Sequence, residues 1–445
     1  MSNPSTTTSS TLDYSSDTSD PPLFPPSHHH NPRLNRYTRP LISYVRNEWQ
    51  LSNSKYSQLP TTTGNNTNTA DSSLNYYLQM ILSIITAPRF RRYAIVYLSL
   101  VLGCLVGWEY FLAPRMEEHA ELVKALDPDV GESVGGWFGV NALPRLEGVV
   151  LLGELAGELV PGASGSGTGS GSGKNDGKEK TGTGRRLVVV GDVHGCSSEL
   201  EHLLTEVTFT PSTDHLILAG DLINKGPDST GVVDLARKYS ASCVRGNHED
   251  RVLVLRRDMI DADTLTDTSA DAFLDGQSTE QAKRDRTLAR KLSDEQAEWL
   301  DACPVILDVG QVPNMGRVAV VHGGLVPGVE LEKQDPFSVM NMLSIDLETH
   351  LPSSERGEGI KWTKLFNKHQ SVTYSNLKST STEVARAQTT TVIYGHDSKT
   401  GLNIKTYTKG LDSGCVKGGK LTALVISDDG EQELVQVRCN NYLDS

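Results

Sequence analysis

The stretch LVVVGDVHG (187–195) combines an apolar run with two side chains that could bind a metal. Its β-branched residues predict a strand that ends at Gly191, with Asp192 and His194 in the turn that follows. Residues i and i+2 of an extended backbone point to the same side, so this carboxylate and this imidazole can converge on one point. The pair suits a divalent metal of the Zn, Mn or Fe kind. One such pair can arise by coincidence, so it indicates a metal site only if similar motifs recur in the chain.

The same pattern, an apolar run followed by glycine and polar side chains, recurs four times. The segments are GDLINKGP (220–227), RGNHED (245–250), VHGGL (321–325) and YGHD (394–397). With the first motif they offer six candidate ligands, namely Asp192, His194, Asp221, Asn247, His322 and His396. Two divalent ions about 3.5–4 Å apart need a bridging carboxylate and N/O ligands, with positions left open for water and substrate. Because each candidate follows a predicted strand, where α/β sheets place their sites, we expect one dinuclear centre.

The elements that must position these residues alternate between strand and helix from residue 185 onward. Apolar runs at 216–219, 241–244, 317–321 and 391–394 predict strands, and Ser293-Asp294-Glu295-Gln296 is a capping box that predicts a helix over 293–302. LTALVI and ELVQVRC, on either side of Asp429-Gly430, predict a hairpin. Residues 258–291, acidic and then basic, predict a solvated helical insertion.

Residues 93–112, YAIVYLSLVLGCLVGWEYFL, are long and apolar enough to cross a bilayer, since about 20 residues at 1.5 Å each span the hydrocarbon. Tyrosine and tryptophan near both ends are typical of membrane interfaces. Arg89, Arg91 and Arg92 precede the segment, whereas Arg115 after it is followed by acidic residues. The excess of arginine predicts a cytosolic amino side, with everything after Leu112 in the lumen or outside the cell.

We therefore divide the chain into four parts. Residues 1–88, rich in Ser, Thr, Asn and Pro, predict a disordered cytosolic tail, and 93–112 predict the transmembrane helix. Residues 115–184 predict a juxtamembrane segment and a Gly/Ser linker, although part of 137–160 could add a strand to the folded domain. Residues 185–445 predict the catalytic domain.

The composition limits the partners that the protein can bind, but it does not indicate whether the protein works in an oxidising or a reducing compartment. The net charge of −13 over 445 residues argues against a nucleic-acid partner. Local cations must then help the metals to hold any polyanion, and the candidates near the motifs are Lys225, Arg245, Lys399 and Lys420. The six cysteines show no CxxC pair and indicate no disulfide framework.

The run GDVHG…GD…GNHE…HGG…GH resembles the calcineurin-like metallophosphoesterases over 185–445. The resemblance implies an α/β fold, a β-sandwich flanked by helices with two metals between the sheets. By analogy with its protein-phosphatase branch, Asp192 and His194 would bind the first ion, Asp221 would bridge, and the other three candidates would bind the second. His248 resembles the family's general acid, and Lys225 stands where that branch has a phosphate-binding arginine.

The chain departs from the family pattern at two further positions. Asn224 replaces the aspartate that orients the catalytic histidine in protein phosphatases, and a neutral amide cannot raise a histidine pKa as an anion would. Ser398 replaces the second histidine of the GHxH motif found in many members, which implies water in the shell of the first ion.

GDLINKGPDS, GHDSKTGL and LDSGCVKGGKLTALVI resemble the symmetrical diadenosine tetraphosphatases and their eukaryotic relatives. With an amino-terminal membrane segment, the chain also resembles the zinc-dependent endopolyphosphatases of fungal vacuoles. The resemblance implies hydrolysis of inorganic polyphosphate at the vacuolar membrane with two divalent ions, zinc by preference, with Co, Mn or Mg as alternatives. Three other functions remain open: dinucleoside polyphosphate hydrolysis, serine/threonine protein dephosphorylation, and a membrane-tethered polyphosphate-binding module without activity.

Overall fold

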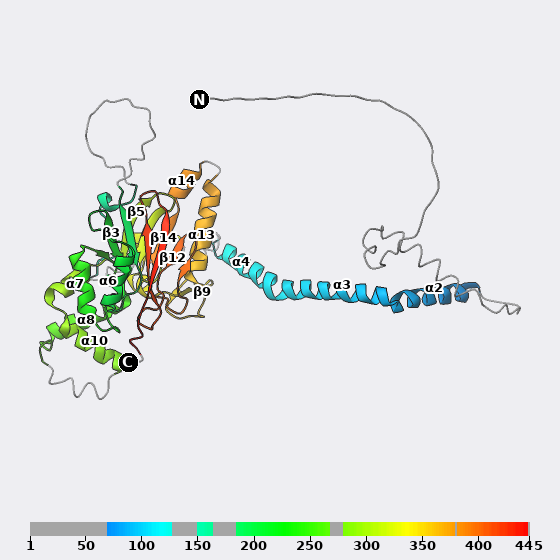
Figure 1. Cartoon of the computed structure of the whole chain (residues 1–445), viewed down its shortest axis with the longest axis horizontal. Coiled ribbons are helices and arrows are strands. Elements are labelled where there is room, and N and C mark those ends of the chain that lie inside the picture. The colour runs from blue at the N-terminus through cyan, green and yellow to red at the C-terminus, as the bar shows by residue number, and fades with distance from the viewer. Residues whose placement is uncertain (1–68, 127–148, 163–183, 268–278, 379–380, 444–445) are drawn as a thin grey trace, which may run out of the picture. The chain divides into compact units, whose positions relative to one another are not determined.

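The computed structural model describes residues 69–126, 149–162, 184–267, 279–378 and 381–443 (Figure 1). By its internal contacts the chain divides into two units, Met1–Ser99 and Leu100–Ser445. The folded domain lies in the second unit, and its centre consists of two β-sheets.

The strand order of the six-stranded sheet is β1-β5-β6-β10-β12-β11, and that of the five-stranded sheet is β14-β13-β2-β3-β4. The first sheet contains β1 (Leu152–Glu154), β5 (Ile306–Val312), β6 (Gly316–Val321), β10 (Thr390–Tyr394), β11 (Asn403–Ile404) and β12 (Thr408–Gly410). The second contains β2 (Arg186–Val190), β3 (Asp214–Leu218), β4 (Ser242–Cys243), β13 (Lys420–Ile426) and β14 (Gln432–Arg438). A small third sheet contains β7 (Ser344–Ile345), β8 (Pro352–Ser353) and β9 (Ile360–Lys361).

Alternate side chains of β2 enter two different apolar cores. Leu187 and Val189 join a core that also contains Val320 and Ile393 of the six-stranded sheet. Val188 and Val190 face the helices instead. Because successive side chains of a strand point to opposite faces, the first core lies between the two sheets. The sheets therefore form a β-sandwich, which confirms the predicted fold class.

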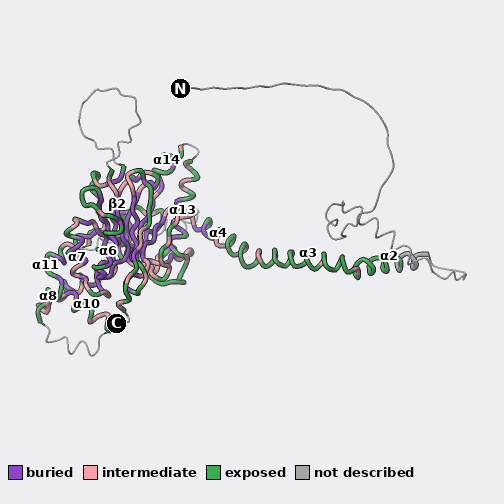
Figure 2. Tube along the Cα trace, in the orientation of Figure 1, coloured by how far each residue is buried: buried purple, intermediate pink, exposed green. Residues whose placement is uncertain are grey.

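Helices cover both outer faces of the sandwich, and Figure 2 shows the buried residues concentrated in the sheets between them. The five-stranded sheet shares its outer core with α6 (Ser197–Glu206), α7 (Ser229–Lys238), α8 (Asn247–Asp261), α10 (Glu280–Lys291) and α11 (Asp294–Asp301). The six-stranded sheet packs against α12 (Pro336–Asn341) and α13 (Trp362–Leu377). The remaining elements of the domain are α14 (Thr382–Ala387) and the short 3₁₀ turns η2 (Gly157–Leu159) and η3 (Leu331–Lys333).

The strand ends explain how distant motifs meet. β2, β3 and β4 are parallel neighbours, so their carboxyl ends share one edge, where Asp192, Asp221 and Asn247 follow. β6 and β10 are also parallel neighbours, and they are followed by His322 and His396. The sandwich brings these two edges together.

Several local predictions are confirmed. β13 and β14 form the expected hairpin, and α11 begins with the expected capping box at Ser293. β1 pairs with β5 in parallel, so part of 137–160 does add a strand to the domain. The Gly/Ser stretch 163–183 lies outside the described residues.

Three predictions need correction. Residues 69–86 of the predicted disordered tail form α2 (Thr69–Thr86), because the apolar run after Leu74 favours a helix; residues 1–68 are outside the described range. The insertion 258–291 is not only solvated, since Leu288 and Asp285 of α10 are buried. Four cysteines form disulfides, Cys243–Cys303 and Cys415–Cys439, whereas Cys196 is free and buried. Their spacing gave no sign of this, because the fold and not the sequence brings each pair together.

One helical stretch, Pro88–Ala125, is long and apolar enough to cross a membrane. It consists of α3 (Pro88–Gly107), the π-helical turn η1 (Trp108–Leu112) and α4 (Ala113–Ala125). Its best 18-residue window has a mean hydropathy of 1.8, and none of that window is buried. An apolar helical window of this length with no buried residue is typical of a membrane span.

Candidate metal centre

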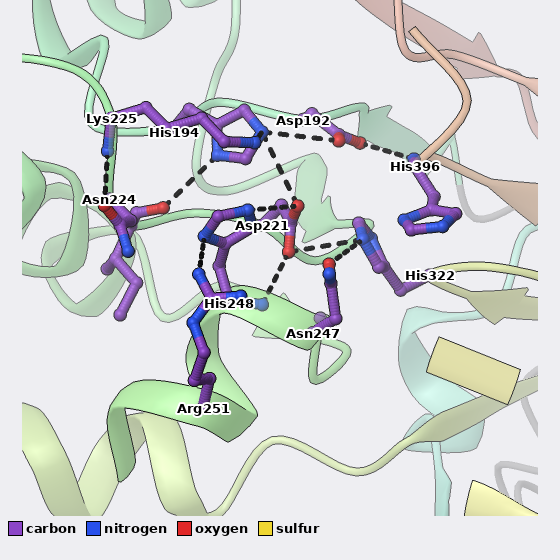
Figure 3. Close-up of polar contacts among 12 residues, drawn as sticks. Asp192, His194, Asp221, Asn224, Lys225, Asn247, His248, Arg251, His322 and His396 are labelled. Carbon is purple, nitrogen blue, oxygen red and sulfur yellow. Dashed lines mark hydrogen bonds and ion pairs between the residues drawn. The ribbon is translucent and has the colours of Figure 1, made fainter. Parts of the chain in front are cut away.

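Asp221 lies at the centre of a cluster of buried side chains (Figure 3). Its Oδ2 lies 3.5 Å from His194 Nε2 and its Oδ1 lies 3.2 Å from His322 Nε2. The carboxylate therefore faces a different imidazole with each oxygen. Two groups of possible metal ligands, His194–Asp221–His248 and Asp192–Asp221–His322, have their ligand atoms within 4.8 Å of one another and share Asp221. A carboxylate common to two groups has the position that a bridging ligand needs.

The two groups combine Asp192 with His322 and His194 with His248, whereas the resemblance implied that Asp192 and His194 share the first ion. The six candidate ligands nevertheless come together. Five of them line one pocket, and the sixth, His322, contacts two of the others, Asp221 and Asn247. His194 Nε2 lies 3.8 Å from Asp192 Oδ2, and the rings of His322 and His396 have centroids 5.0 Å apart.

Hydrogen bonds to backbone carbonyls occupy one ring nitrogen in each of three imidazoles. His322 Nδ1 lies 2.9 Å from Ala219 O, His194 Nδ1 lies 3.3 Å from Ile223 O, and His396 Nε2 lies 3.1 Å from Asn341 O. Since only the ring nitrogen can donate in such a contact, the other nitrogen of a neutral ring is an acceptor. This arrangement fixes the tautomer of metal-binding histidines in general.

His322 Nε2 lies 3.2 Å from Asp221 Oδ1 and 3.2 Å from the side-chain amide of Asn247, which can turn either its oxygen or its N–H toward the ring. An imidazole, a carboxylate and an amide that converge on one point form a donor set that fits a metal. Nitrogen and oxygen ligands of this kind suit Zn and neighbouring divalent metals.

The charges of the pocket favour a cation at the same point. Burial acts to raise the pKa of Asp221, but the imidazoles of His322 and His248 outweigh it and hold that pKa well below its usual range. Burial acts to lower the pKa of His322, but Asp221 and Asp192 raise it to about 10. The carboxylates thus stabilise positive charge between them, as a metal site must.

Three of the candidate ligands have backbone conformations that non-glycine residues rarely adopt. The φ angles are +49° for His194, +49° for Asp221 and +69° for His396. Each such residue costs of order 1–3 kcal/mol relative to an ordinary conformation. Their concentration in one pocket indicates that the fold maintains these turns for the position of the side chains.

The turns also need glycine at points of close approach. A Cβ on Gly395 would lie 2.1 Å from Asp192 Oδ1, and one on Gly246 would lie 2.4 Å from Asp221 Oδ1. Both contacts are far inside van der Waals distance. The glycines of GNH and GH therefore make room for the two carboxylates.

Glu249, which the sequence analysis did not single out, positions the turn of Asp221. It is fully buried, and its carboxylate accepts hydrogen bonds from the backbone N–H groups of Asp221, Ile223 and Gly246 at 2.8–3.1 Å. Burial, followed by the charge of Asp221, raises the pKa of Glu249 to about 7. Its place in the GNHE motif was the available signal, but side-chain to backbone contacts across 28 residues cannot be inferred from a motif.

His248 contacts a guanidinium, whereas the catalytic histidine of protein phosphatases is oriented by a carboxylate (Figure 3). Arg251 Nη2 lies 2.8 Å from His248 Nδ1, and Arg251 Nε donates to Asp285. Asn224 donates its amide N–H to the same Asp285 and does not contact His248. Because a guanidinium can only donate, His248 Nδ1 is the acceptor and Nε2 carries the ring proton. Burial lowers the pKa of His248 to about 4, with Lys225 and Arg251 acting in the same direction against Asp221.

Two lysines line the pocket, and only one of them was predicted. Lys225 Nζ lies 2.9 Å from His194 Nε2, while Lys417 Nζ donates to Ser398 Oγ at 2.7 Å. Lys417 was missed because it lies 22 residues beyond Gly395 on a loop after β12, and the sequence gives no register for that loop.

The other three predicted substrate ligands are not in the pocket. Arg245 is completely buried and donates to Asp250 and Asp301, so its guanidinium serves the fold, and the prediction for it is corrected. Lys420 donates to Gln436 across the β13–β14 hairpin, and Lys399 is exposed and outside the pocket lining. A lysine near a motif in sequence therefore need not lie near the site.

Comparison with known proteins agrees with this geometry. Residues 185–399 match the calcineurin-like phosphoesterase family. These residues form a calcineurin-like phosphoesterase domain. The family uses a dinuclear metal site, and the two groups of side chains that share Asp221 could hold such a pair of ions. The chain therefore contains a metallophosphoesterase domain, of the hydrolase class.

Individual relatives share most of the phosphoesterase domain. The zinc-dependent endopolyphosphatase of Saccharomyces cerevisiae is 29% identical over 285 residues, which cover 58% of this chain and 83% of the relative. A symmetrical bis(5'-nucleosyl)-tetraphosphatase of Aromatoleum aromaticum is 28% identical over 299 residues, which cover 58% of this chain and 99% of the relative. A crystal structure assigned as a diadenosine tetraphosphatase is 29% identical, with a TM-score of 0.44, and the match covers 58% of this chain and 96% of that one.

Proposed function

We propose that this phosphoesterase hydrolyses phosphoanhydride bonds inside inorganic polyphosphate chains, with two divalent ions, zinc by preference, held by the six ligands around Asp221. The ions would polarise the phosphoryl group under attack. Zinc is favoured by the three imidazole ligands and by the name of the S. cerevisiae relative.

The observation that carries this proposal is the pair of lysines beside the metal ligands. Lys225 and Lys417 both line the pocket that contains Asp192, Asp221 and His396. Two divalent ions would more than balance the carboxylates, so the loaded pocket would carry a positive excess on an otherwise acidic protein. Ammonium groups in the same pocket as the reacting phosphate can hold the next phosphates of a chain by charge-assisted hydrogen bonds.

The environment of His248 favours a phosphoanhydride over a phosphoserine. The Nδ1 atom of His248 is bonded to Arg251, and no carboxylate among the described residues contacts that nitrogen. Without such a carboxylate, little stabilises the doubly protonated ring that would donate a proton to a serine alkoxide. The phosphate leaving group of an anhydride is a far weaker base and needs little protonation. Polyphosphate and dinucleoside polyphosphates should therefore be better substrates for this site than phosphoproteins.

We expect Lys417→Ala and Lys225→Ala to raise KM for long polyphosphate by roughly tenfold or more, since a hydrogen bond to a charged group contributes about 1.5–3 kcal/mol. The increase should be smaller for tripolyphosphate, which offers fewer phosphates to hold. Steady-state kinetics on both substrates checks this result. Lys333→Ala is the matched control, because Lys333 is a surface residue paired with Glu330 outside the pocket. Equal KM values for wild type and both pocket variants would contradict the role of the two lysines.

We further propose that the chain crosses a membrane once and that its catalytic domain lies on the lumenal side, in the vacuole as the resemblance to fungal endopolyphosphatases implies. The arginines at 89, 91 and 92 favour a cytosolic amino side. The two disulfides provide independent support, because disulfides persist in oxidising compartments and are rare in the cytosol.

Protease added to sealed vesicles should therefore remove the amino-terminal tail and leave the catalytic domain intact. Immunoblotting with antibodies against each part measures the outcome, and detergent that opens the vesicles provides the control in which both parts are digested. Digestion of the catalytic domain in sealed vesicles would show that the orientation is the reverse.

The proposed activity is tested by incubating the purified protein with long polyphosphate, diadenosine tetraphosphate and a phosphoserine peptide, each with Zn, Co, Mn and Mg in turn. We expect polyphosphate to be cleaved fastest, with mid-length fragments appearing before much free phosphate. Faster cleavage of diadenosine tetraphosphate would favour the second candidate function, which the A. aromaticum relative supports. Peptide as the best substrate would contradict the phosphoanhydride assignment.

A further inference from the structure

Asp412 lies beside the metal ligands because two neighbouring strands are in register. β10 and β12 are parallel, with Tyr394 opposite Gly410. His396 follows Tyr394 by two residues, and Asp412 follows Gly410 by two residues. Adjacent strands thus bring a histidine and an aspartate to the same edge of the sheet, although the two residues belong to different motifs.

Asp412 is buried and its carboxyl group faces another carboxyl group. It is 5% exposed, it lines the same pocket as Asp192, and the two carboxyl groups are close enough to act on each other. Two carboxyl groups in contact share either one proton or one cation, because both cannot be ionised and unpaired in a buried site.

Lys225 acts on Asp412 through its charge, but neither pocket lysine is hydrogen-bonded to this carboxylate. Lys225 Nζ is at His194 Nε2 and Lys417 Nζ is at Ser398 Oγ. Within the ranges that the structure describes, no lysine or arginine lies within 4.0 Å of the Asp412 carboxylate as an ion pair. Ser398, at the position where other family members have a histidine, already accepts a hydrogen bond from Lys417.

We propose that Asp412 is a seventh metal-binding side chain, which helps Asp192, His194 and Asp221 to hold the first ion. The first ion then has three carboxylates and one imidazole. The second has two imidazoles, the Asn247 amide and the shared Asp221. Carboxylates suit Mn and Mg better than imidazoles do, so the first site should accept these harder ions more readily than the second.

A purely structural role for Asp412 is the competing explanation. Its Oδ1 accepts a hydrogen bond from the backbone N–H of Gly414 at 3.0 Å, as in many turns that begin with Asp or Asn. Asparagine can make the same hydrogen bond but carries no charge. Asp412→Asn therefore separates the two roles.

The test uses the full-length chain in detergent, loaded with Zn²⁺ or Mn²⁺ and dialysed, with metal content measured by mass spectrometry. We expect nearly two ions per wild-type chain and about one per Asp412→Asn chain, with an affinity for the weaker ion reduced at least about tenfold. Asp397→Asn is the matched control: Asp397 also accepts a backbone hydrogen bond within a turn, from Thr400, but it pairs with Arg356 outside the pocket. Retention of two ions, or loss of both, in Asp412→Asn would overturn the assignment.

Thermal unfolding gives a second readout that does not depend on activity. With metal present, Asp412→Asn should unfold at a lower temperature than wild type. With a chelator, it should be as stable as wild type or more stable, because one of two facing carboxyl groups has lost its charge. A structural role would lower the unfolding temperature equally in both conditions. Neither readout depends on the substrate, so a failure here is distinct from a failure of the polyphosphate proposal.

Discussion

Replacement of Asp221 by asparagine should abolish turnover and release both metal ions. The two carboxylate oxygens face different imidazoles, Oδ2 toward His194 and Oδ1 toward His322, so one side chain serves both halves of the centre. An amide has one acceptor oxygen and no charge, so it cannot bridge two cations. Metal content and hydrolysis of polyphosphate by the purified variant measure the two effects.

Asp335→Asn is the matched control for this substitution. Asp335 caps the amino end of α12 and accepts a hydrogen bond from Ser338 N at 2.9 Å. Asparagine is an equally good cap, so this variant should retain both ions and full activity. Normal turnover in Asp221→Asn would rule out the bridging role.

His248→Asn should keep both metal ions and lower the rate by roughly 10²–10⁴, the range expected when general acid–base catalysis is lost. The imidazole contacts Asp221 only at 3.8 Å, whereas the backbone N–H of His248, which the variant keeps, donates to Asp221 Oδ1 at 3.0 Å. The decrease should be smaller for substrates with good leaving groups, since those need less protonation. Rates with p-nitrophenyl phosphate, an alkyl phosphate and polyphosphate measure this dependence.

His215→Asn is the control for this second variant. His215 is a buried histidine of β3 whose Nε2 lies 2.8 Å from Ser242 Oγ, away from the pocket. The His215→Asn variant should change the stability of the protein but not the way in which the hydrolysis rate depends on the leaving group. Loss of an ion from His248→Asn would mean that His248 is a ligand, as its place in the His194–Asp221–His248 group allows.

The strands and the residues at their ends could be predicted from the sequence because each signal is local. A β-branched run, a glycine and a ligand occupy fewer than ten consecutive residues, and parallel strands bring such ends together whatever lies between them. The hairpin at Asp429-Gly430 and the capping box at Ser293 are local signals of the same kind.

The contacts that the sequence did not reveal join distant segments. Asp285 meets Asn224 and Arg251 only because α10 packs beside α8, and the composition of 258–291 suggested a solvated face. Asp412 depends on the pairing of β12 with β10. The prediction for Arg245 failed because closeness in sequence did not mean closeness in space. Arg245 precedes a ligand motif, but its side chain points away from the pocket and donates to Asp301 on α11.

The most direct test of the account is a crystal structure of the zinc-loaded protein with anomalous scattering recorded at the zinc edge. We predict two peaks about 3.5–4 Å apart, both at coordination distance of about 2.0–2.2 Å from Asp221, one on the side of Asp192 and His194 and the other on the side of Asn247, His322 and His396. A single peak, or two peaks that do not share Asp221, would contradict the dinuclear centre from which the proposed function follows.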